Sequence, residues 1–148
     1  MKNKGFSLVE LIIVIAIMAI LAAAIAPALI RYIDKSRKAD DLAAAETINT
    51  AVSAALANED AYSEVAGVMD GTTAIASATQ NAAFTGTGST FIDEINSSCG
   101  GVSPKLKYTK NSATGWEVRV SNNGKPMVFV VAGQNKIELQ PEINKDYK

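Results

Sequence analysis

The hydrophobic positions divide the chain into a long apolar N-terminal segment and a remainder of mixed composition. Residues 11–30 carry no charged side chain, and Arg31 ends this run. At a rise of ~1.5 Å per residue, a helix of this length spans the ~30 Å hydrocarbon core of a bilayer. The pattern therefore predicts a helix over residues 6–30 that is able to cross a membrane.

The same helix is expected to continue beyond Arg31 as an amphipathic segment. No Gly or Pro interrupts the chain between Pro27 and Gly67, and residues 40–58 are rich in Ala, the best helix former. Apolar residues recur there at helical spacing and make a single stripe. The stripe consists of Ala45, Ile48, Val52, Ala55 and Leu56. We expect a helix from Phe6 to about Ala57, with this stripe packed on a sheet.

Residues 105–140 predict four short strands separated by Gly- and Asn-containing turns. The expected strands are residues 105–110, 116–121, 127–132 and 136–140. The second alternates apolar and polar residues, which indicates one buried face. The third is apolar on both faces and suits a central strand. Short turns favour antiparallel neighbours, so the fold class is α+β, with a long N-terminal helix packed on a four-stranded antiparallel β-meander.

Residues 59–104 connect the helix to this sheet and carry weaker signals. One or two further helical turns are expected before Gly67 and Gly71. Residues 72–89 are low in charge and rich in Ala, Thr, Ser and Gly, which predicts a long loop. Residues 89–95 predict a short helix with Ser89 or Thr90 as its N-cap.

One carboxylate, Glu10, lies at the start of the apolar run. A carboxylate within a membrane helix costs ~2.5–3.5 kcal/mol on insertion scales, so it requires a functional reason and a partner. Lys2 and Lys4 precede Glu10, but they belong at the lipid headgroups and favour a cytoplasmic N-terminus. A partner on another molecule is therefore expected.

Two simpler interpretations of this segment compete: an ordinary single-pass anchor, and a secretory signal cleaved after Ala24-Ile25-Ala26. The apolar run exceeds the ~7–15 residues usual for the core of a secretory signal. Pro27 would also follow the cut directly and hinder it. Neither interpretation explains Glu10.

Residues 4–10, Lys-Gly-Phe-Ser-Leu-Val-Glu, followed by an apolar helix, resemble the class III signal of type IV pilins and type II secretion pseudopilins. The resemblance implies that a prepilin peptidase cleaves between Gly5 and Phe6 and that the new Phe6 amine is methylated. It also implies that Glu10 recruits each subunit into a helical filament beside the Phe6 amine of a neighbour. Similar filaments have loosened helix near the residue matching Pro27, where a kink or local melting is expected.

The resemblance implies a pilin-like organisation and function. The expected parts are a leader at residues 1–5, a transmembrane and assembly helix at 6–30, its amphipathic half at 31–58, a connecting region at 59–104, and the sheet with a C-terminal tail at 105–148. The implied function is a type IV pilus subunit, with roles in adhesion or twitching motility. The alternative is a minor pilin, or a pseudopilin of a type II secretion or DNA-uptake apparatus.

The resemblance also implies the partners and the location. These partners are further copies of the chain, the prepilin peptidase and methyltransferase, and the assembly machinery of the inner or cytoplasmic membrane. The precursor is expected to span the cytoplasmic membrane once and then to enter an extracellular filament.

Charge is unevenly distributed although the net charge is only −1, which argues against nucleic acid as a partner. Residues 39–104 contain no Lys or Arg, whereas basic residues outnumber acidic ones from Lys105 onward. This asymmetry indicates either ordinary solvated surface or two complementary faces that steer one subunit onto another. A DNA-binding minor pilin would use lysines to contact phosphates and aromatic side chains to stack on bases. The simpler interpretation of the same lysines is that they protect an exposed strand edge from pairing with other chains. The candidates are Lys105, Lys107, Lys110, Lys125, Tyr108 and Trp116.

Composition also bears on catalysis and metal binding. The chain has no histidine, which removes the commonest general base and metal ligand. Cys99 is the only cysteine, so no intrachain disulfide can staple the C-terminus. Glu138, Glu142 and Asp146 lie scattered among lysines, without the ligand spacing of a calcium loop. We therefore expect no enzymatic activity, no cofactor and no metal.

Overall fold

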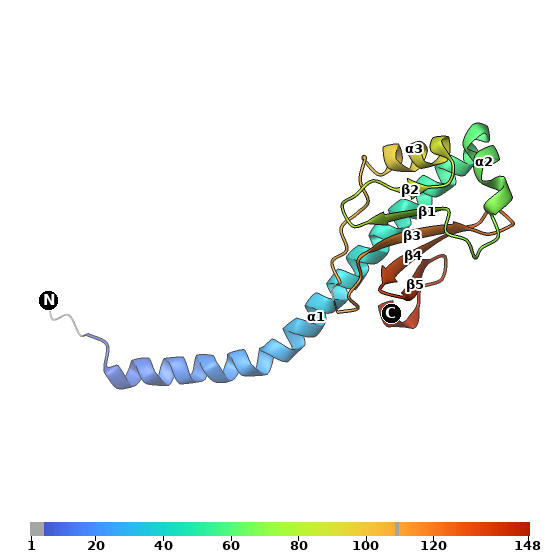
Figure 1. Ribbon diagram of the computed structural model, residues 1–148. Helices are drawn as coiled ribbons and strands as arrows, with labels where there is room; N and C mark the ends of the chain where they lie inside the picture. Colours follow the sequence, from blue (N-terminus) through green and yellow to red (C-terminus); the bar gives the residue numbers. More distant parts are fainter. Residues whose placement is uncertain (1–4, 109) are drawn as a thin grey trace. The chain divides into compact units, whose positions relative to one another are not determined.

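A computed structural model describes residues 5–108 and 110–148 (Figure 1). The chain divides into two compact units, an N-terminal unit up to Ser36 and a unit over Arg37–Lys148, which we call the head. Helix α1, Leu8–Ala57, contributes its first part to the N-terminal unit and its second part to the head. The predicted long helix is confirmed, beginning two residues after Phe6.

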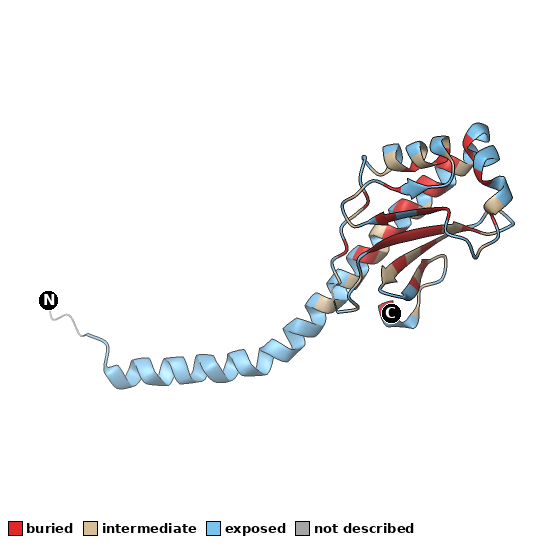
Figure 2. Cartoon of the chain, in the orientation of Figure 1, coloured by how far each residue is buried: buried red, intermediate tan, exposed pale blue. Residues whose placement is uncertain are grey.

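The N-terminal unit presents its apolar side chains to the surroundings. Large hydrophobic residues from Phe6 to Ile33 are exposed, and Figure 2 shows this stretch as exposed throughout. Among the described residues, α1 is the one helix long and apolar enough to cross a membrane, with a mean hydropathy of 3.0 over its most apolar window. This apolar surface requires lipid or other protein to cover it.

Within the head, α1 buries the predicted apolar stripe. Ala45, Ile48, Val52 and Ala55 are fully buried and Leu56 is partly buried. These side chains belong to one hydrophobic core with those of the sheet that α1 crosses in Figure 1. The helix-on-sheet arrangement is therefore confirmed.

The head contains one antiparallel sheet of five strands, ordered β2-β1-β3-β4-β5. The strands are β1 Ala76–Thr79, β2 Thr85–Gly86, β3 Gly115–Val120, β4 Pro126–Ala132 and β5 Asn135–Gln140. The last three form the predicted meander, and β4 lies inside the sheet as expected for an apolar strand. Pairing aligns Val118 with Val128 and Val130 with Ile137, all buried in the core. The α+β class is confirmed, with five strands in place of four.

The strand predicted over residues 105–110 is wrong. Residues 105–108 and 110 lie outside any strand. The backbone N–H groups of Lys107 and Tyr108 donate to the carboxylate of Asp41 on α1, at 2.7 Å and 3.1 Å, rather than to a neighbouring strand. Leu106 is buried, so the segment is anchored to the helix by one apolar side chain and one carboxylate.

The long loop predicted over residues 72–89 is also wrong, because β1 and β2 lie within it. Ala76 and Ala78 of β1 are buried and alternate with exposed Ser77 and Thr79. This pattern has the period of a strand, but small side chains give it little hydrophobic contrast. Gly115 permits the close pairing of β1 with β3, since a Cβ there would lie 2.3 Å from the carbonyl oxygen of Ala78.

Two short helices complete the connecting region, as expected. Helix α2, Glu59–Val65, is capped by Asn58 and continues into the 3₁₀ turn η1, Ala66–Val68. Helix α3, Ser89–Ser98, has Gly88 at its N-cap, so the predicted Ser or Thr cap is wrong. The carboxylate of Glu64 on α2 replaces it, accepting the N–H groups of Thr90 and Phe91 at 2.9 Å and 3.2 Å. These bonds outweigh partial desolvation and lower the pKa of Glu64.

The C-terminal tail is held without a disulfide. The 3₁₀ turn η2, Lys145–Tyr147, buries the Tyr147 ring against Tyr108 in an edge-on contact. The Tyr147 hydroxyl accepts a bond from the Asn111 amide at 2.9 Å and donates to Asp41 at 3.4 Å. The tail is thus fixed to the same carboxylate that anchors residues 107 and 108.

Candidate assembly site at the N-terminus

The predicted cleavage position precedes α1 in an exposed, non-helical segment. Gly5 and Phe6 have no regular secondary structure, and the Phe6 side chain is 85% exposed. Within residues 5–108 and 110–148, and apart from its chain neighbours, no atom lies within 4 Å of the position that a Cβ on Gly5 would take. The peptide bond between them is therefore sterically accessible to a peptidase.

Helix α1 begins with a capping box formed by Ser7 and Glu10. The Ser7 N–H donates to Glu10 Oε2 at 2.9 Å, and the Val9 N–H donates to Ser7 Oγ at 3.4 Å. Leu11 N–H donates to the Ser7 carbonyl and starts the helical ladder. The Ser-x-x-Glu spacing is a known N-terminal signature that satisfies two otherwise unpaired donors. It was readable in residues 7–10 but our sequence interpretation did not use it.

Glu10 has a neutral hydrogen-bond donor within the chain but no cationic partner among the described residues. Lys2 and Lys4 lie outside those residues. A carboxylate has about four acceptor positions on two oxygens. The capping bond occupies one of them, so Glu10 can accept from a further donor without releasing Ser7.

Pro27 lies inside α1, and the helix is unbroken through it. Proline has no N–H and disfavours helical backbone at the preceding residue, here Ala26. The kink or local melting expected near this proline stays a prediction.

The structure does not bring all six residues considered for a DNA-binding patch together on one surface. Trp116 is fully buried and donates its Nε1–H to the Pro104 carbonyl at 2.7 Å, so no base can stack on it. Lys125 lies in the turn between β3 and β4, at the opposite end of β3 from Gly115. Tyr108 is covered by Lys38, whose Nζ lies 5.0 Å from the ring centre.

The sequence did not predict that two carboxylates, those of Asp41 and Glu117, are buried, and both stabilise the head. Asp41 is the anchor described above. Glu117 on β3 pairs with Arg119 at 2.7 Å and with Lys136 at 2.6 Å. Burial raises the pKa of Glu117, but the hydrogen bonds and positive charges of these two partners outweigh it, so the pKa lies below its usual value. Among the described residues, no group of three His, Cys, Asp or Glu could hold a metal ion.

Comparison with known proteins identifies the N-terminal segment. Residues 1–26 match the family model of the prokaryotic N-terminal methylation motif. No solved structure matches the chain. The matched region contains Gly5, Phe6 and the capping box, and it ends one residue before Pro27. The chain therefore carries the class III prepilin signal found in type IV pilins and pseudopilins, joined to a head of pilin-like α+β arrangement.

Proposed function

We propose that this protein is a structural, non-enzymatic subunit of a type IV pilus, processed by a prepilin peptidase and assembled through α1 into a helical surface filament. The observation that carries the proposal is an exposed apolar helix with a single carboxylate, Glu10, in its first turn. The prepilin signal and a helix suited to membrane insertion support a precursor held in the cytoplasmic membrane.

Cleavage supplies the positive charge that Glu10 lacks. Hydrolysis of the Gly5–Phe6 bond releases the leader and leaves an α-amine on Phe6. Such an amine has a pKa of about 7.7–8.0 and is largely protonated at neutral pH. An N-methylated amine remains a cation with N–H donors. Each mature subunit then carries one cation and one carboxylate near the start of the same helix.

Electrostatic attraction between the Phe6 amine and Glu10 would favour pairing of subunits in register. At 4 Å separation, two unit charges attract by about 4 kcal/mol at an effective dielectric constant of 20. A carboxylate buried without a partner is strongly destabilising, so a misregistered subunit is disfavoured. Because Glu10 keeps a free acceptor position beside its capping bond, it can receive the Phe6 amine of a neighbour.

The second half of the apolar segment suits close helix packing. Small residues there permit helix backbones to approach each other in an apolar environment. They are Ala19, Ala22, Ala23, Ala24, Ala26 and Ala28. A bundle of such helices would cover the apolar surface that a single copy leaves exposed.

The test is Glu10→Ala, with Glu46→Ala on the exposed face of the same helix as the matched control. We expect Glu10→Ala to insert in the membrane normally and to yield no filaments, because the subunit has lost the carboxylate that pairs with the Phe6 amine of a neighbour. Glu46→Ala is expected to assemble. Normal filaments from Glu10→Ala would refute the assigned role.

The same signal also occurs in pseudopilins, which makes a secretion or DNA-uptake pseudopilin, or a minor pilin, the second candidate. A major pilin is expected to be the dominant protein of filaments sheared from the cell surface. Its absence from sheared filaments, despite processing, would favour the second candidate.

A further inference from the structure

Acidic side chains gather at the end of the head where α1 finishes. Figure 1 shows α2 and α3 beside that end. Asp93 and Glu94 line a shallow groove on α3, and Asn58 ties α3 to the end of α1 by donating to Glu94 at 3.1 Å. Glu59 and Asp60 are exposed in the first turn of α2. We call these four carboxylates the acidic end.

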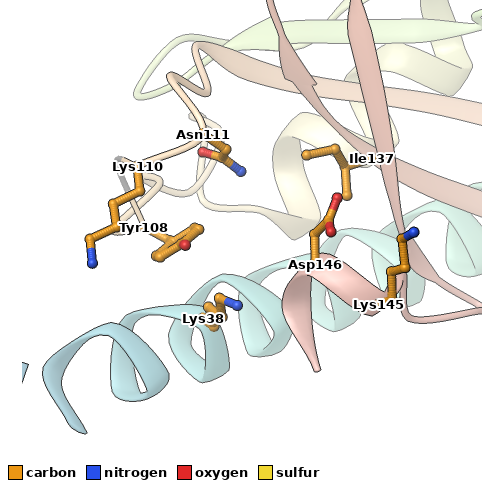
Figure 3. Close-up of a pocket in the computed structure, with 7 residues that line it drawn as sticks. All are labelled: Lys38, Tyr108, Lys110, Asn111, Ile137, Lys145 and Asp146. Carbon is orange, nitrogen blue, oxygen red and sulfur yellow. The ribbon is translucent and has the colours of Figure 1, made fainter. Parts of the chain in front are cut away.

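Basic side chains gather at the opposite end, where α1 enters the head. One hollow there is lined by Arg37, Lys105, Leu106 and Lys107. A second hollow, drawn in Figure 3, brings Lys38 of α1 together with Lys145 of η2 and Lys110. The residues of these two hollows define the basic end, in which Asp146 is the one acidic member.

The two ends are rigidly separated by the buried part of α1. At the basic end, Asp41 of α1 holds residues 107 and 108 by accepting their backbone N–H groups. At the acidic end, Asn58 holds α3 by donating to Glu94. The helix between residues 41 and 57 is about 24 Å long. Opposite charges at this distance are well beyond a Debye length of ~8 Å at physiological salt, so they do not neutralise each other.

Local pairing removes only part of each charge. The ion pair of Lys107 with Asp40 at 3.1 Å offsets one charge of the basic end. The contact of Lys38 with the neutral Tyr108 ring leaves the charge of Lys38 in place. Arg37 and Lys105 remain exposed beside them, as do Glu59 and Asp93 at the other end. The head therefore has one negative and one positive end along the direction of α1.

We propose that the acidic end of one copy docks on the basic end of the next, as a head-to-tail contact that sets the axial order of subunits. The inference rests on the proposed filament function and adds a second contact to that made by Glu10. A contact between two different patches leaves a free patch on each end of the pair, so further copies can add, whereas a symmetric dimer uses the same patch on both copies. Such a contact generates an open filament when the rotation between successive copies does not close a ring. Charge complementarity of this kind steers encounters and suppresses wrong registers.

Charge-swap variants of the full chain test the contact. The acid swap is Glu59→Lys with Asp93→Lys, and the base swap is Arg37→Glu with Lys105→Glu. Each places like charges across the contact, and we expect filament yield to fall at least about tenfold, equivalent to ~1.4 kcal/mol. The variant with all four changes restores opposite charges and should assemble near the wild-type level. Glu138→Lys with Glu142→Lys matches the acid swap in charge but lies outside both ends, and it should assemble.

The outcomes separate this contact from the proposed function. Fluorescence of buried Trp116 reports whether each variant head is folded. Assembly of the wild type supports the pilin function. The head-to-tail contact is nevertheless refuted if the folded acid swap or the folded base swap also assembles normally. It is likewise refuted if the folded variant with all four changes fails to assemble.

If the wild type forms no filaments, the pilin function fails, and cross-linking still tests the contact. Zero-length lysine–carboxylate cross-linking of mixed light and heavy isotope copies, in membranes, should join Asp93 or Glu94 of one copy to Lys38, Lys105 or Lys145 of another. Inter-copy links confined to other pairs would overturn the inference.

Discussion

Removing the Asp41 carboxylate should destabilise the head more than any other single charge removal on α1. Asp41 is 0% exposed, and its oxygens accept the Lys107 N–H at 2.7 Å, the Tyr108 N–H at 3.1 Å and the Tyr147 hydroxyl at 3.4 Å. Asp41→Ala leaves two backbone N–H groups without an acceptor, and it also removes the contact that holds the C-terminal tail.

The expected loss follows from these bonds. A buried donor left unsatisfied costs ~1–3 kcal/mol, so the two N–H groups together cost about 2–6 kcal/mol. A small domain has a free energy of unfolding of about 5–15 kcal/mol, so the change is a large fraction of the total. Asp40→Ala is the matched control. It removes a surface ion pair to Lys107 between side chains that are 47% and 56% exposed, which is worth ~0–1 kcal/mol.

The assay is a urea titration of the full chain in a mild detergent, followed by the fluorescence of Trp116. This is the only tryptophan, and it is fully buried in the core to which α1 and the sheet both contribute, so it reports the head and not the apolar helix. We expect the midpoint of Asp41→Ala to fall well below that of Asp40→Ala. Equal midpoints for the two variants would refute the anchor described for Asp41.

Three further changes test other features of the head. Glu64→Ala removes the remote cap of α3, so hydrogen exchange at the first α3 amides should accelerate, whereas Glu59→Ala should leave it unchanged. Gly115→Ala places a Cβ 2.3 Å from a β1 carbonyl oxygen and should lower the free energy of unfolding by ~1–3 kcal/mol, measured by urea titration. Gly67→Ala, in open space, should leave it unchanged, and equal effects of the two changes would contradict the close strand pairing. Burial raises the pKa of Tyr147 to about 12, so its hydroxyl stays neutral in the folded state after the unfolded chain has ionised near pH 10. Stability should therefore fall as pH rises from about 10 to 12, and a Tyr147→Phe variant with the same fall would contradict that shift.

The features predictable from sequence are those with strong hydrophobic periodicity. The stripe from Ala45 to Leu56 identifies the buried face of α1, because apolar and polar side chains there differ sharply. The apolar residues of β4 identify an interior strand for the same reason. Both depend on local pattern alone.

The errors arise where contacts distant in sequence decide the structure. Asp40 and Asp41 are adjacent and identical in type, yet only Asp41 is buried, because residues 107 and 108 bring their N–H groups to it. The N-cap of α3 comes from Glu64, which lies 26 residues before Thr90. No local signal connects such partners, so the strand over residues 105–110 and the Ser or Thr cap were incorrect.

At the candidate assembly site, the sequence supplied the identity of the residues and the structure supplied their local bonding. The motif identifies Gly5 and Phe6, and Glu10 stands out both in the motif and as a carboxylate at the start of an apolar helix. Their exposed, non-helical setting and the bond from the Ser7 N–H to Glu10 come from the structure. The intermolecular partner of Glu10 lies beyond a single chain, so it follows from charge rather than from observed contact.

Processing at the Gly5–Phe6 bond can be read from the N-terminus of the mature protein. N-terminal sequencing and intact-mass measurement of protein purified from membranes and from surface filaments give its position and modification. We expect a chain that begins at Phe6 and carries one additional methyl group on its amine. A chain that retains Met1, or one that has lost residues 1–26, would contradict it.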